Sequence, residues 1–378
     1  MSAKGMKVLI TADAVGGVWQ YSTELAAGLS RLGIGTVLAV MGPAASDEQL
    51  AAARIPGVEL IETGLALDWL AEDGASLRVA GAAILGLAHA HGASLVQLNT
   101  PALAAETEFD LPVVAVQHSC VATWWEAVQG SPLPADFAWR TELNRRGLHA
   151  ADAVVTPTTA FGEMVRRRYA LAEAPRTVHN GRTPPQLPNS APHDFVFTAG
   201  RLWDEGKNLG TLDAAARTIG VPVRAAGPLK GPNGAEVMFE HLHCLGNLGD
   251  EELARWLSAR PVFVSAALYE PFGLAVLEAA SAGCPLILSD IPTFRELWDD
   301  VAIFVPARDE TGFTRAIADL VSDDFERAVL GRAARERARR YTPDAMAAQM
   351  ASLYRGLLPA VQRPVLAAAR IEVGAAAA

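Results

Sequence analysis

The chain has 378 residues, of which 51% are hydrophobic and 20% are charged, and its formal net charge is −10. This length and composition indicate two or three folded domains and exclude a disordered chain. The acidic balance also argues against a general nucleic-acid binder, although a local cluster of cations can still bind a small anionic ligand.

The cysteines and the N-terminal residues indicate in which cellular compartment the protein is expected. Cys120, Cys244 and Cys284 are an odd set without metal-binding spacing. The first residues do not resemble a signal peptide, and no segment reaches the roughly 18 apolar residues of a membrane span. We therefore expect a cytoplasmic protein with reduced cysteines.

Short runs rich in Val, Ile and Leu alternate with segments of helical period, which predicts an α/β chain of parallel strands connected by helices. In the first half the predicted strands are Lys7–Thr11, Thr36–Met41, Val58–Glu62, Ser94–Leu98, Val113–Gln117 and Ala153–Thr156. The clearest helices between them are Gly17–Arg31, Ser76–His91 and Asp136–Ala150.

A proline-rich segment divides the chain. Residues 183–193 hold four prolines in eleven residues and no apolar period, which is typical of a linker. The strand pattern then resumes at Phe195–Ala199, Val223–Ala226, Leu242–Leu245, Val262–Ser265, Leu286–Ser289 and Ala302–Val305. We expect two doubly wound, Rossmann-like domains, residues 1–182 and 194–342, with the ligand in the cleft between them.

One motif of the second half follows a predicted strand and opens a helix that Gly283 ends. Pro271 suits the first helical turn and directs Glu270 to the lip of the cleft, with Glu278 eight residues further on. The helix N-terminus forms an anion site from the N–H groups of Phe272, Gly273 and Leu274.

Other roles remain open for this pair of glutamates. They can be a helix-terminal acid and a solvated surface residue, or the acid and base of a glycosidase, whose carboxyl groups stand about 5–9 Å apart. The glycosidase reading leaves the anion-binding helix end unexplained.

A second motif places two cations at the same edge of the sheet. Arg201 follows the strand after the linker, and Lys207 precedes a helix that Asn208 is expected to cap. A bidentate guanidinium and a mobile ammonium together suit a diphosphate. The alternative is that both cations form surface ion pairs with Asp204 and Glu205.

These two motifs resemble those of the retaining glycosyltransferases of the GT-B fold, in the large group 1 or GT4 family. The resemblance covers nearly the whole chain. It also includes the segments 13–18, 116–118, 179–181, 245–253 and 294–297.

The resemblance implies that the second domain binds a nucleoside diphosphate sugar and the first binds the acceptor. Arg201 and Lys207 would hold the diphosphate and stabilise its departure, so both are expected to be catalytic. Glu278 would bind the ribose hydroxyls, and Gly246 to Leu248 would line the base.

The same resemblance places the reacting sugar. Glu270 would bind its hydroxyls with help from the N–H groups of residues 272–274, and His118 would contact it from the first domain, so both are also expected to be catalytic. Gly16 and Gly17 would bring a flexible loop against the phosphates on closure. A histidine at a strand end can also be purely structural.

The predicted chemistry needs no metal and no cofactor. When the nucleoside diphosphate leaves, negative charge develops on the β-phosphate, where Arg201, Lys207 and the helix end stabilise it most in the transition state. The sequence also lacks an Asp-x-Asp signature. By the resemblance, the acceptor attacks the face from which the diphosphate leaves, the anomeric configuration is retained, and the departing phosphate accepts the acceptor's proton.

The acceptor is less defined. Trp124 and Trp125, placed in an irregular loop after His118, are expected either to stack on an acceptor or to belong to the core. Glu296 either supports the site or lies on a helix surface beside Arg295. A sugar, a lipid-linked sugar or a small molecule would serve as acceptor, with surface polysaccharide or glycolipid assembly as the setting.

A basic segment and the C-terminal helix indicate whether the protein can contact a membrane and how its two domains are connected. Residues 137–170 carry six arginines against three acidic residues, which predicts either a solvated helix face or a contact with the inner face of a membrane. By the resemblance, the last helix, Asp344–Leu357 within a segment 343–365, crosses back onto the first domain. Residues 366–378 are expected to be a flexible tail.

Three rival functions fit parts of the pattern. A phosphorylase or hydrolase on the same fold would, for phosphorylase chemistry, need a lysine-bound pyridoxal phosphate, and no matching lysine context is evident. A dinucleotide oxidoreductase would need a Gly-x-Gly-x-x-Gly turn after the first strand, where residues 13–18 read DAVGGV. A non-catalytic nucleotide-sugar-binding protein would keep the fold and the donor residues.

Overall fold

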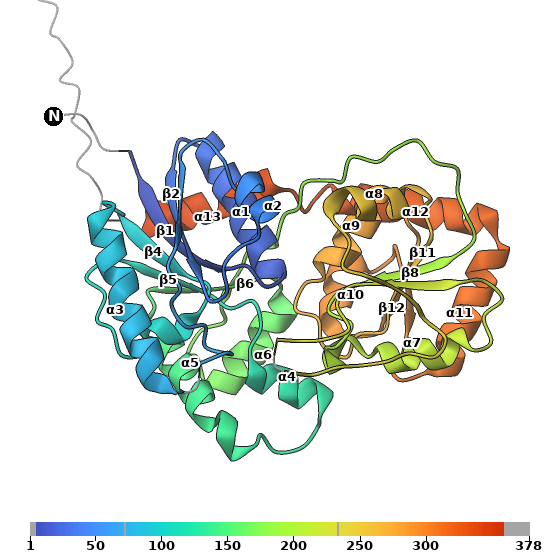
Figure 1. The fold of residues 1–378 in the computed structure, drawn as a ribbon, viewed down its shortest axis with the longest axis horizontal. Helices are drawn as coiled ribbons and strands as arrows, with labels where there is room; N and C mark the ends of the chain where they lie inside the picture. The colour runs from blue at the N-terminus through green and yellow to red at the C-terminus, as the bar shows by residue number, and fades with distance from the viewer. Residues whose placement is uncertain (1–4, 72, 233, 359–378) are drawn as a thin grey trace, which may run out of the picture.

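The structure, a computed structural model, describes residues 5–71, 73–232 and 234–358. Two parallel β-sheets lie side by side, each covered by helices on both faces, and the chain passes between them twice (Figure 1). We call the layers around the N-terminal sheet the first domain and those around the C-terminal sheet the second domain.

The first sheet has the strand order β3-β2-β1-β4-β5-β6-β7, with every pairing parallel. Its strands are β1 (Lys7–Asp13), β2 (Gly35–Met41), β3 (Val58–Glu62), β4 (Leu95–Leu98), β5 (Val113–Val116), β6 (Ala153–Thr156) and β7 (Arg176–Thr177). Its helices are α1 (Gly17–Arg31), α2 (Asp47–Ala52), α3 (Gly74–Ala90), α4 (Val121–Val128), α5 (Ala138–Ala150) and α6 (Thr159–Tyr169), with short 3-10 turns η1 (Pro101–Ala104) and η2 (Ala135–Phe137).

The second sheet has the order β10-β9-β8-β11-β12-β13, again all parallel. Its strands are β8 (Val196–Ala199), β9 (Val223–Ala226), β10 (His243–Gly246), β11 (Val262–Ser265), β12 (Leu286–Ser289) and β13 (Ile303–Val305). Its helices are α7 (Leu209–Ala216), α8 (Asp250–Ser258), α9 (Leu274–Ala282), α10 (Pro292–Trp298), α11 (Glu310–Ser322) and α12 (Asp324–Ala338), with the 3-10 turn η3 (Glu205–Lys207).

Both sheets reverse their strand order at an internal point. The reversal lies between β1 and β4 in the first sheet and between β8 and β11 in the second. Ligands of such sheets bind beyond the carboxyl ends of the strands at this point. The loops that follow these four strands are therefore the first place to look for a site.

The last helix, α13 (Pro343–Leu357), returns to the first domain, where it lies along α1 (Figure 1). Thr342 caps its N-terminus by accepting from the N–H of Ala345. Met346, Met350 and Tyr354 are fully buried in the core that surrounds β1. Burial of each such side chain contributes about 1.5–3 kcal/mol, so α13 is an integral part of the first domain.

The predicted α/β class and the two doubly wound sheets are confirmed. All twelve predicted strands are present, with ends displaced by at most two residues. Sequence reasoning missed β7, because Arg176 and Thr177 form no apolar run. The crossing of the last helix to the first domain is also confirmed as far as Leu357; the predicted helical residues 359–365 and the tail 366–378 lie outside the described residues.

Candidate functional site

The carboxyl ends of β8 and β11 bring two predicted site residues together. The ammonium of Lys207, at the end of η3, forms an ion pair with Oε2 of Glu270, in the loop after β11. Both side chains are mostly buried, with 18% and 16% of their surface exposed. This pair joins the predicted diphosphate cation to the carboxylate predicted to hold the donor sugar.

Arg201 lies at the same edge, in the loop after β8. Its Nη2 contacts Oδ2 of Asp204 at 2.8 Å, and its guanidinium lies 5.6 Å from the ring of Trp203. Nearly half of the side chain, 46%, is exposed. The predicted alternative of an ion pair with Asp204 is thus present, and it engages Nη2 while nearly half of the side chain stays exposed.

The next feature is the N-terminus of α9. Gly273 has a φ of +91°, a left-handed conformation that favours glycine, and a Cβ there would lie 3.1–3.3 Å from Phe294, Glu270 and Val276. The helix therefore begins at Leu274, and the expectation that Pro271 occupies its first turn is wrong. Pro271 lies in the bend before the helix, because the left-handed Gly273 stops helical geometry from extending back to it.

Asn208 also differs from its predicted role. It stands at the N-cap position of α7, yet its side chain makes no capping bond to a backbone N–H. Its conformation is left-handed, with φ of 54°, and its amide donates to the carbonyls of Ala266 and Ala307 at 2.9 and 2.7 Å. Asn208 therefore fixes the loop that carries Lys207 to the ends of β11 and β13.

A first-domain loop reaches this edge from the other side. A Cβ built on Gly17 would lie 3.4 Å from Leu274, so the start of α1 faces the start of α9. Gly16, the N-cap of α1, has a φ of +113°. Asp13, the last residue of β1, precedes this loop. Burial raises the pKa of its carboxyl, while the Val15 amide and the charge of Arg201 lower it.

His118 lies just past β5, with its ring against Tyr21 at a centroid distance of 4.3 Å. Its Nε2 is 3.2 Å from Oδ1 of Asn99, and the amide nitrogen of Asn99 already donates to the Thr11 carbonyl. Nε2 therefore carries the proton, and Nδ1 is left as an acceptor. Burial lowers the pKa of His118 to about 3, so the ring is neutral at physiological pH.

The predicted base-binding residues lie at the end of β10. Gly246 has a φ of +71°, and its carbonyl accepts from the N–H of Gly227 at 2.7 Å. Leu248 is half-buried against the core of the second domain. Gly200, Gly227 and Gly246 thus end three neighbouring strands, and a Cβ on Gly227 would lie 1.7 Å from the Gly200 carbonyl.

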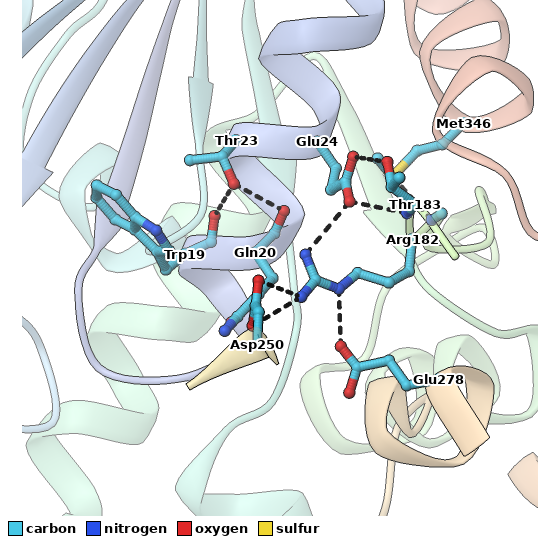
Figure 2. A network of polar contacts seen from close by, with 10 residues as sticks. Trp19, Gln20, Thr23, Glu24, Arg182, Thr183, Asp250, Glu278 and Met346 are labelled. Atoms are coloured by element: carbon cyan, nitrogen blue, oxygen red, sulfur yellow. Dashed lines mark hydrogen bonds and ion pairs between the residues drawn. The ribbon is translucent and has the colours of Figure 1, made fainter. Parts of the chain in front are cut away.

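Glu278, the predicted ribose ligand, lies on α9 and binds a residue that sequence reasoning missed. Arg182 donates from Nε to Oε1 of Glu278 at 2.7 Å and also contacts Glu24 and Asp250 (Figure 2). Burial raises the pKa of Glu278, and the charge of Arg182 opposes that effect. The position of Arg182 directly after the segment 179–181 was a signal in the sequence that this residue lies near the site. No sequence pattern indicated that Arg182 pairs with Glu278.

Comparison with known proteins decides the family. Residues 236–337 match the model of the glycosyl transferases group 1, and residues 15–184 match that of glycosyltransferase family 4. The chain belongs to these glycosyltransferases. The two matches lie on opposite sides of the linker, so each domain carries its own half of the family pattern.

Among curated proteins, a phosphatidyl-myo-inositol mannosyltransferase of Mycobacterium leprae is 31% identical over 120 residues, which is 31% of this chain and 32% of that protein. A D-inositol 3-phosphate glycosyltransferase of Streptomyces avermitilis is 30% identical over 31% of this chain and 26% of its own length. A glycogen synthase of Mycobacterium tuberculosis is 24% identical over 63% of this chain and 61% of its own. The chain thus matches about a third or less of the first two relatives.

Solved structures share the whole fold. A sucrose-phosphate synthase of Thermosynechococcus elongatus has a TM-score of 0.75 at 21% identity, covering 93% of this chain and 99% of that one. The Anabaena protein Alr3699/HepE in complex with UDP-glucose has a TM-score of 0.71 at 19% identity, covering 93% and 100%. The GT-B arrangement expected for the family is therefore confirmed.

The first domain holds the loop that carries Glu270. The hydroxyl of the buried Tyr269 hydrogen-bonds to Ser119 at 3.2 Å and to Thr123 at 2.9 Å. The hydroxyl of Thr158, at the start of α6, donates to the carbonyl of Pro271 at 2.9 Å. Residues on both sides of Glu270 are thus bound by the first domain. No sequence pattern predicted these contacts.

Trp124 and Trp125 do not lie in an irregular loop, and that prediction is wrong. They belong to helix α4, whose apolar residues pack on α6. Trp124 donates from Nε1 to Oδ1 of Asp204 at 2.9 Å, and Trp125 lies 5.6 Å from Phe137 and donates to Ser131. Trp124 therefore contacts the loop that carries Arg201 and Lys207, and contact of either ring with an acceptor stays a prediction.

The variant Trp124→Phe separates these two roles. It keeps an aromatic face but removes the N–H that binds Asp204, the residue that also holds Arg201. We expect kcat to fall by about threefold to tenfold with the acceptor KM unchanged, because Asp204 loses one hydrogen bond. Trp125→Phe is the matched control. A rise in acceptor KM at constant kcat would instead support stacking on the acceptor.

Glu296 supports the contact between the domains. From α10 its carboxylate accepts from the N–H groups of Thr159 and Ala160 at 2.9 and 2.8 Å, capping α6 of the first domain. It also contacts His179 at 3.3 Å. These donors lower its pKa against the opposing effect of burial. Arg295 points elsewhere, to Asp290 and Asp299.

The basic segment 137–170 is largely neutralised within the first domain. Arg145, Arg146 and Arg166 form ion pairs with glutamates, and Arg140 donates to backbone carbonyls. Arg145, Arg146, Arg167 and Arg168 are exposed, and of these four Arg167 and Arg168 have no ion pair with a described residue. No helix among the described residues has the length and apolar character to cross a membrane. Membrane contact stays a prediction.

Proposed function

We propose that the protein transfers a sugar from a nucleoside diphosphate sugar to an acceptor hydroxyl, with retention of configuration and without a metal ion. The observation that supports this most is the pair of Lys207 and Glu270, which lies beside the N-terminus of α9 and at the same sheet edge as Arg201. When a donor binds, the ammonium can exchange its carboxylate partner for a phosphate group, and the carboxylate can exchange its ammonium partner for a sugar hydroxyl.

In this proposal the donor separates the pair. The ammonium of Lys207 turns to the diphosphate, where Arg201 and the N–H groups at the start of α9 add further donors. The carboxylate of Glu270 then accepts from hydroxyls of the sugar. The bond between the anomeric carbon and the β-phosphate oxygen breaks, the acceptor oxygen bonds to the same face of that carbon, and the leaving phosphate takes the acceptor proton.

His118 contributes as a neutral group. Its protonated Nε2 is bound to Asn99, so Nδ1 can accept a hydrogen bond from the donor sugar but cannot donate one. Because the pKa of the ring is about 3, protonation does not interfere above that value. His118 thus positions the sugar and is not a general acid in this proposal.

We propose a polyhydroxyl acceptor, either a glycan, a lipid-linked sugar or a small molecule, in polysaccharide or glycolipid assembly. The similarity to a phosphatidyl-myo-inositol mannosyltransferase supports this range. The Anabaena structures with UDP and with UDP-glucose make uridine nucleotides the first donors to test.

Ligand stabilisation tests the proposal. The thermal midpoint is measured with UDP, GDP, ADP and their glucose conjugates, because a ligand at 100 times its Kd stabilises the folded state by about 2.7 kcal/mol. We expect one nucleotide to stabilise the wild type and the shift to be lost in Glu278→Ala and Arg201→Ala. Transfer assays with EDTA and NMR of the product's anomeric proton test metal independence and retention. No shift with any nucleotide would refute the proposal.

A further inference from the structure

Arg182 lies where three carboxylates from three helices converge (Figure 2). Its Nε contacts Glu278 of α9 at 2.7 Å, its Nη1 contacts Glu24 of α1 at 3.3 Å, and its Nη2 contacts Asp250 of α8 at 3.4 Å. The exposed fractions are 16% for Arg182, 14% for Glu278 and 11% for Glu24. One guanidinium therefore balances two mostly buried carboxylates and a third, exposed one.

The two buried carboxylates are not equally satisfied. Glu24 accepts from the N–H and the hydroxyl of Thr183, both at 2.8 Å, in addition to Arg182. Glu278 accepts only from Arg182, and its Oε2 has no hydrogen-bond partner among the residues that the structure describes. The cluster thus leaves one carboxylate oxygen of Glu278 available to hydroxyl donors.

The backbone of Arg182 also marks the place where the two chain crossings between the domains meet. Its N–H donates to the carbonyl of Tyr341 at 3.3 Å, and a Cβ on Gly181 would lie 2.2 Å from the carbonyl of Thr342. A cavity of about 270 Å³ adjoins this point, and Arg182, Asp250 and Glu278 line it together with residues of the linker and of α8. The ion-pair cluster therefore forms part of the wall of this cavity.

We propose that Arg182 is a positioning residue for donor binding, which orients Glu278 toward the two ribose hydroxyls of the nucleotide and ties it to Glu24 of the first domain. This inference rests on the proposed function. A ribose brings hydroxyl donors and no charge, which suits a cluster with more carboxylates than cations. The diphosphate is repelled by this cluster and attracted by Arg201 and Lys207, so the two groups together fix the direction of the nucleotide.

Removing the guanidinium has a consequence that depends on pH. Burial raises the pKa of Glu278, Arg182 lowers it, and Asp250 and Glu24 raise it further. Without Arg182 three carboxylates face one another, and the pKa of Glu278 rises. A protonated Glu278 accepts from fewer hydroxyls, so the loss of ribose binding grows as the pH falls through the raised pKa.

The test is the Kd of UDP, GDP and ADP, measured by calorimetry between pH 5.5 and 8.5 for the wild type, Arg182→Gln and Arg182→Lys. We expect Arg182→Gln to weaken the nucleotide that the wild type binds by about tenfold at pH 6 and by less at pH 8.5. Arg182→Lys keeps a cation and is expected to retain the wild-type pH dependence with a smaller loss. The 2′,3′-dideoxy form of the same nucleotide should bind to all three proteins alike.

Arg327→Gln is the matched control, because Arg327 is similarly buried, with 13% exposed, and binds Asp194 and Asp324 away from the site. Its Kd is expected to equal that of the wild type. Equal loss of the nucleotide and its dideoxy form, or a loss in Arg182→Gln that does not vary with pH, would show a merely structural role and overturn the inference. If Arg182→Gln does not fold, Arg182→Lys and the dideoxy comparison decide. A wild type that binds no nucleotide would refute the proposed function instead.

Discussion

Replacing Lys207 with alanine is expected to lower kcat/KM for sugar transfer by about 10²- to 10³-fold, the usual cost of removing one preorganised donor to a developing negative charge. The ammonium of Lys207 is mostly buried and already lies at the edge of the sheet where the leaving diphosphate would sit. Most of the loss should appear in kcat, because the charge on the β-phosphate oxygen develops as the bond breaks. Steady-state kinetics at saturating acceptor measures it.

A second effect of this variant has to be separated from the first. Lys207→Ala also leaves Glu270 without its cation, and an unpaired carboxylate with 16% exposure can disturb the loop. The double variant Lys207→Ala with Glu270→Gln removes that charge. We expect it to stay as slow as the single variant, whereas recovery of activity would assign the loss to the unpaired carboxylate. Lys230→Ala, which breaks an exposed ion pair with Glu236, is the control for loss of a lysine elsewhere.

The residues of the proposed donor site could be placed at one sheet edge from the sequence because they are local to strand ends. Gly200 and Arg201 directly follow β8, and Glu270 follows β11, so the order of strands and helices already assigns them to one edge of a parallel sheet. Most of the strands are short, buried and rich in branched apolar residues, which is why their positions were predicted within two residues.

The contacts between the domains could not be predicted in the same way. Tyr269 and Ser119 are 150 positions apart, and Trp124 and Asp204 are 80 apart. No periodicity or local motif links such pairs, because they meet only after both domains have folded and docked. The prediction of an irregular loop around Trp124 was wrong for a related reason. Helix α4 has eight residues, too few to show a clear helical period, and its stability comes from packing on α6.

Arg182, at the proposed donor site, could not be paired with Glu278 from the sequence for the same reason. The sequence identifies Glu278 through its spacing from Glu270, but the cation that neutralises it, Arg182, lies just before the linker, 96 positions away. Ion pairs depend on side chains reaching one another in space, and a single sequence carries no record of that distance. From the sequence we could propose the chemical class of the ligand, and the structure adds how the carboxylates are held.

The contact of Tyr269 with the first domain leads to the second large prediction. Tyr269→Phe keeps the buried ring but removes the hydroxyl that binds Ser119 and Thr123. We expect the free energy of unfolding to fall by about 1–3 kcal/mol, because buried hydroxyls lose a partner. We also expect kcat to fall by as much as about 10²-fold, because Glu270, the next residue, loses its position relative to His118. Urea denaturation and steady-state kinetics measure the two effects.

Tyr341→Phe is the matched control for Tyr269→Phe. Both tyrosines have 7% of their surface exposed, and the hydroxyl of Tyr341 donates to the carbonyl of Leu297 at 3.2 Å within the second domain. This control should lose a similar amount of stability while keeping kcat, since its hydrogen bond does not join the domains. A drop in kcat confined to Tyr269→Phe would show that docking of the first domain holds Glu270 in place. Equal kcat values for the two variants would mean that the loop keeps its geometry without this contact.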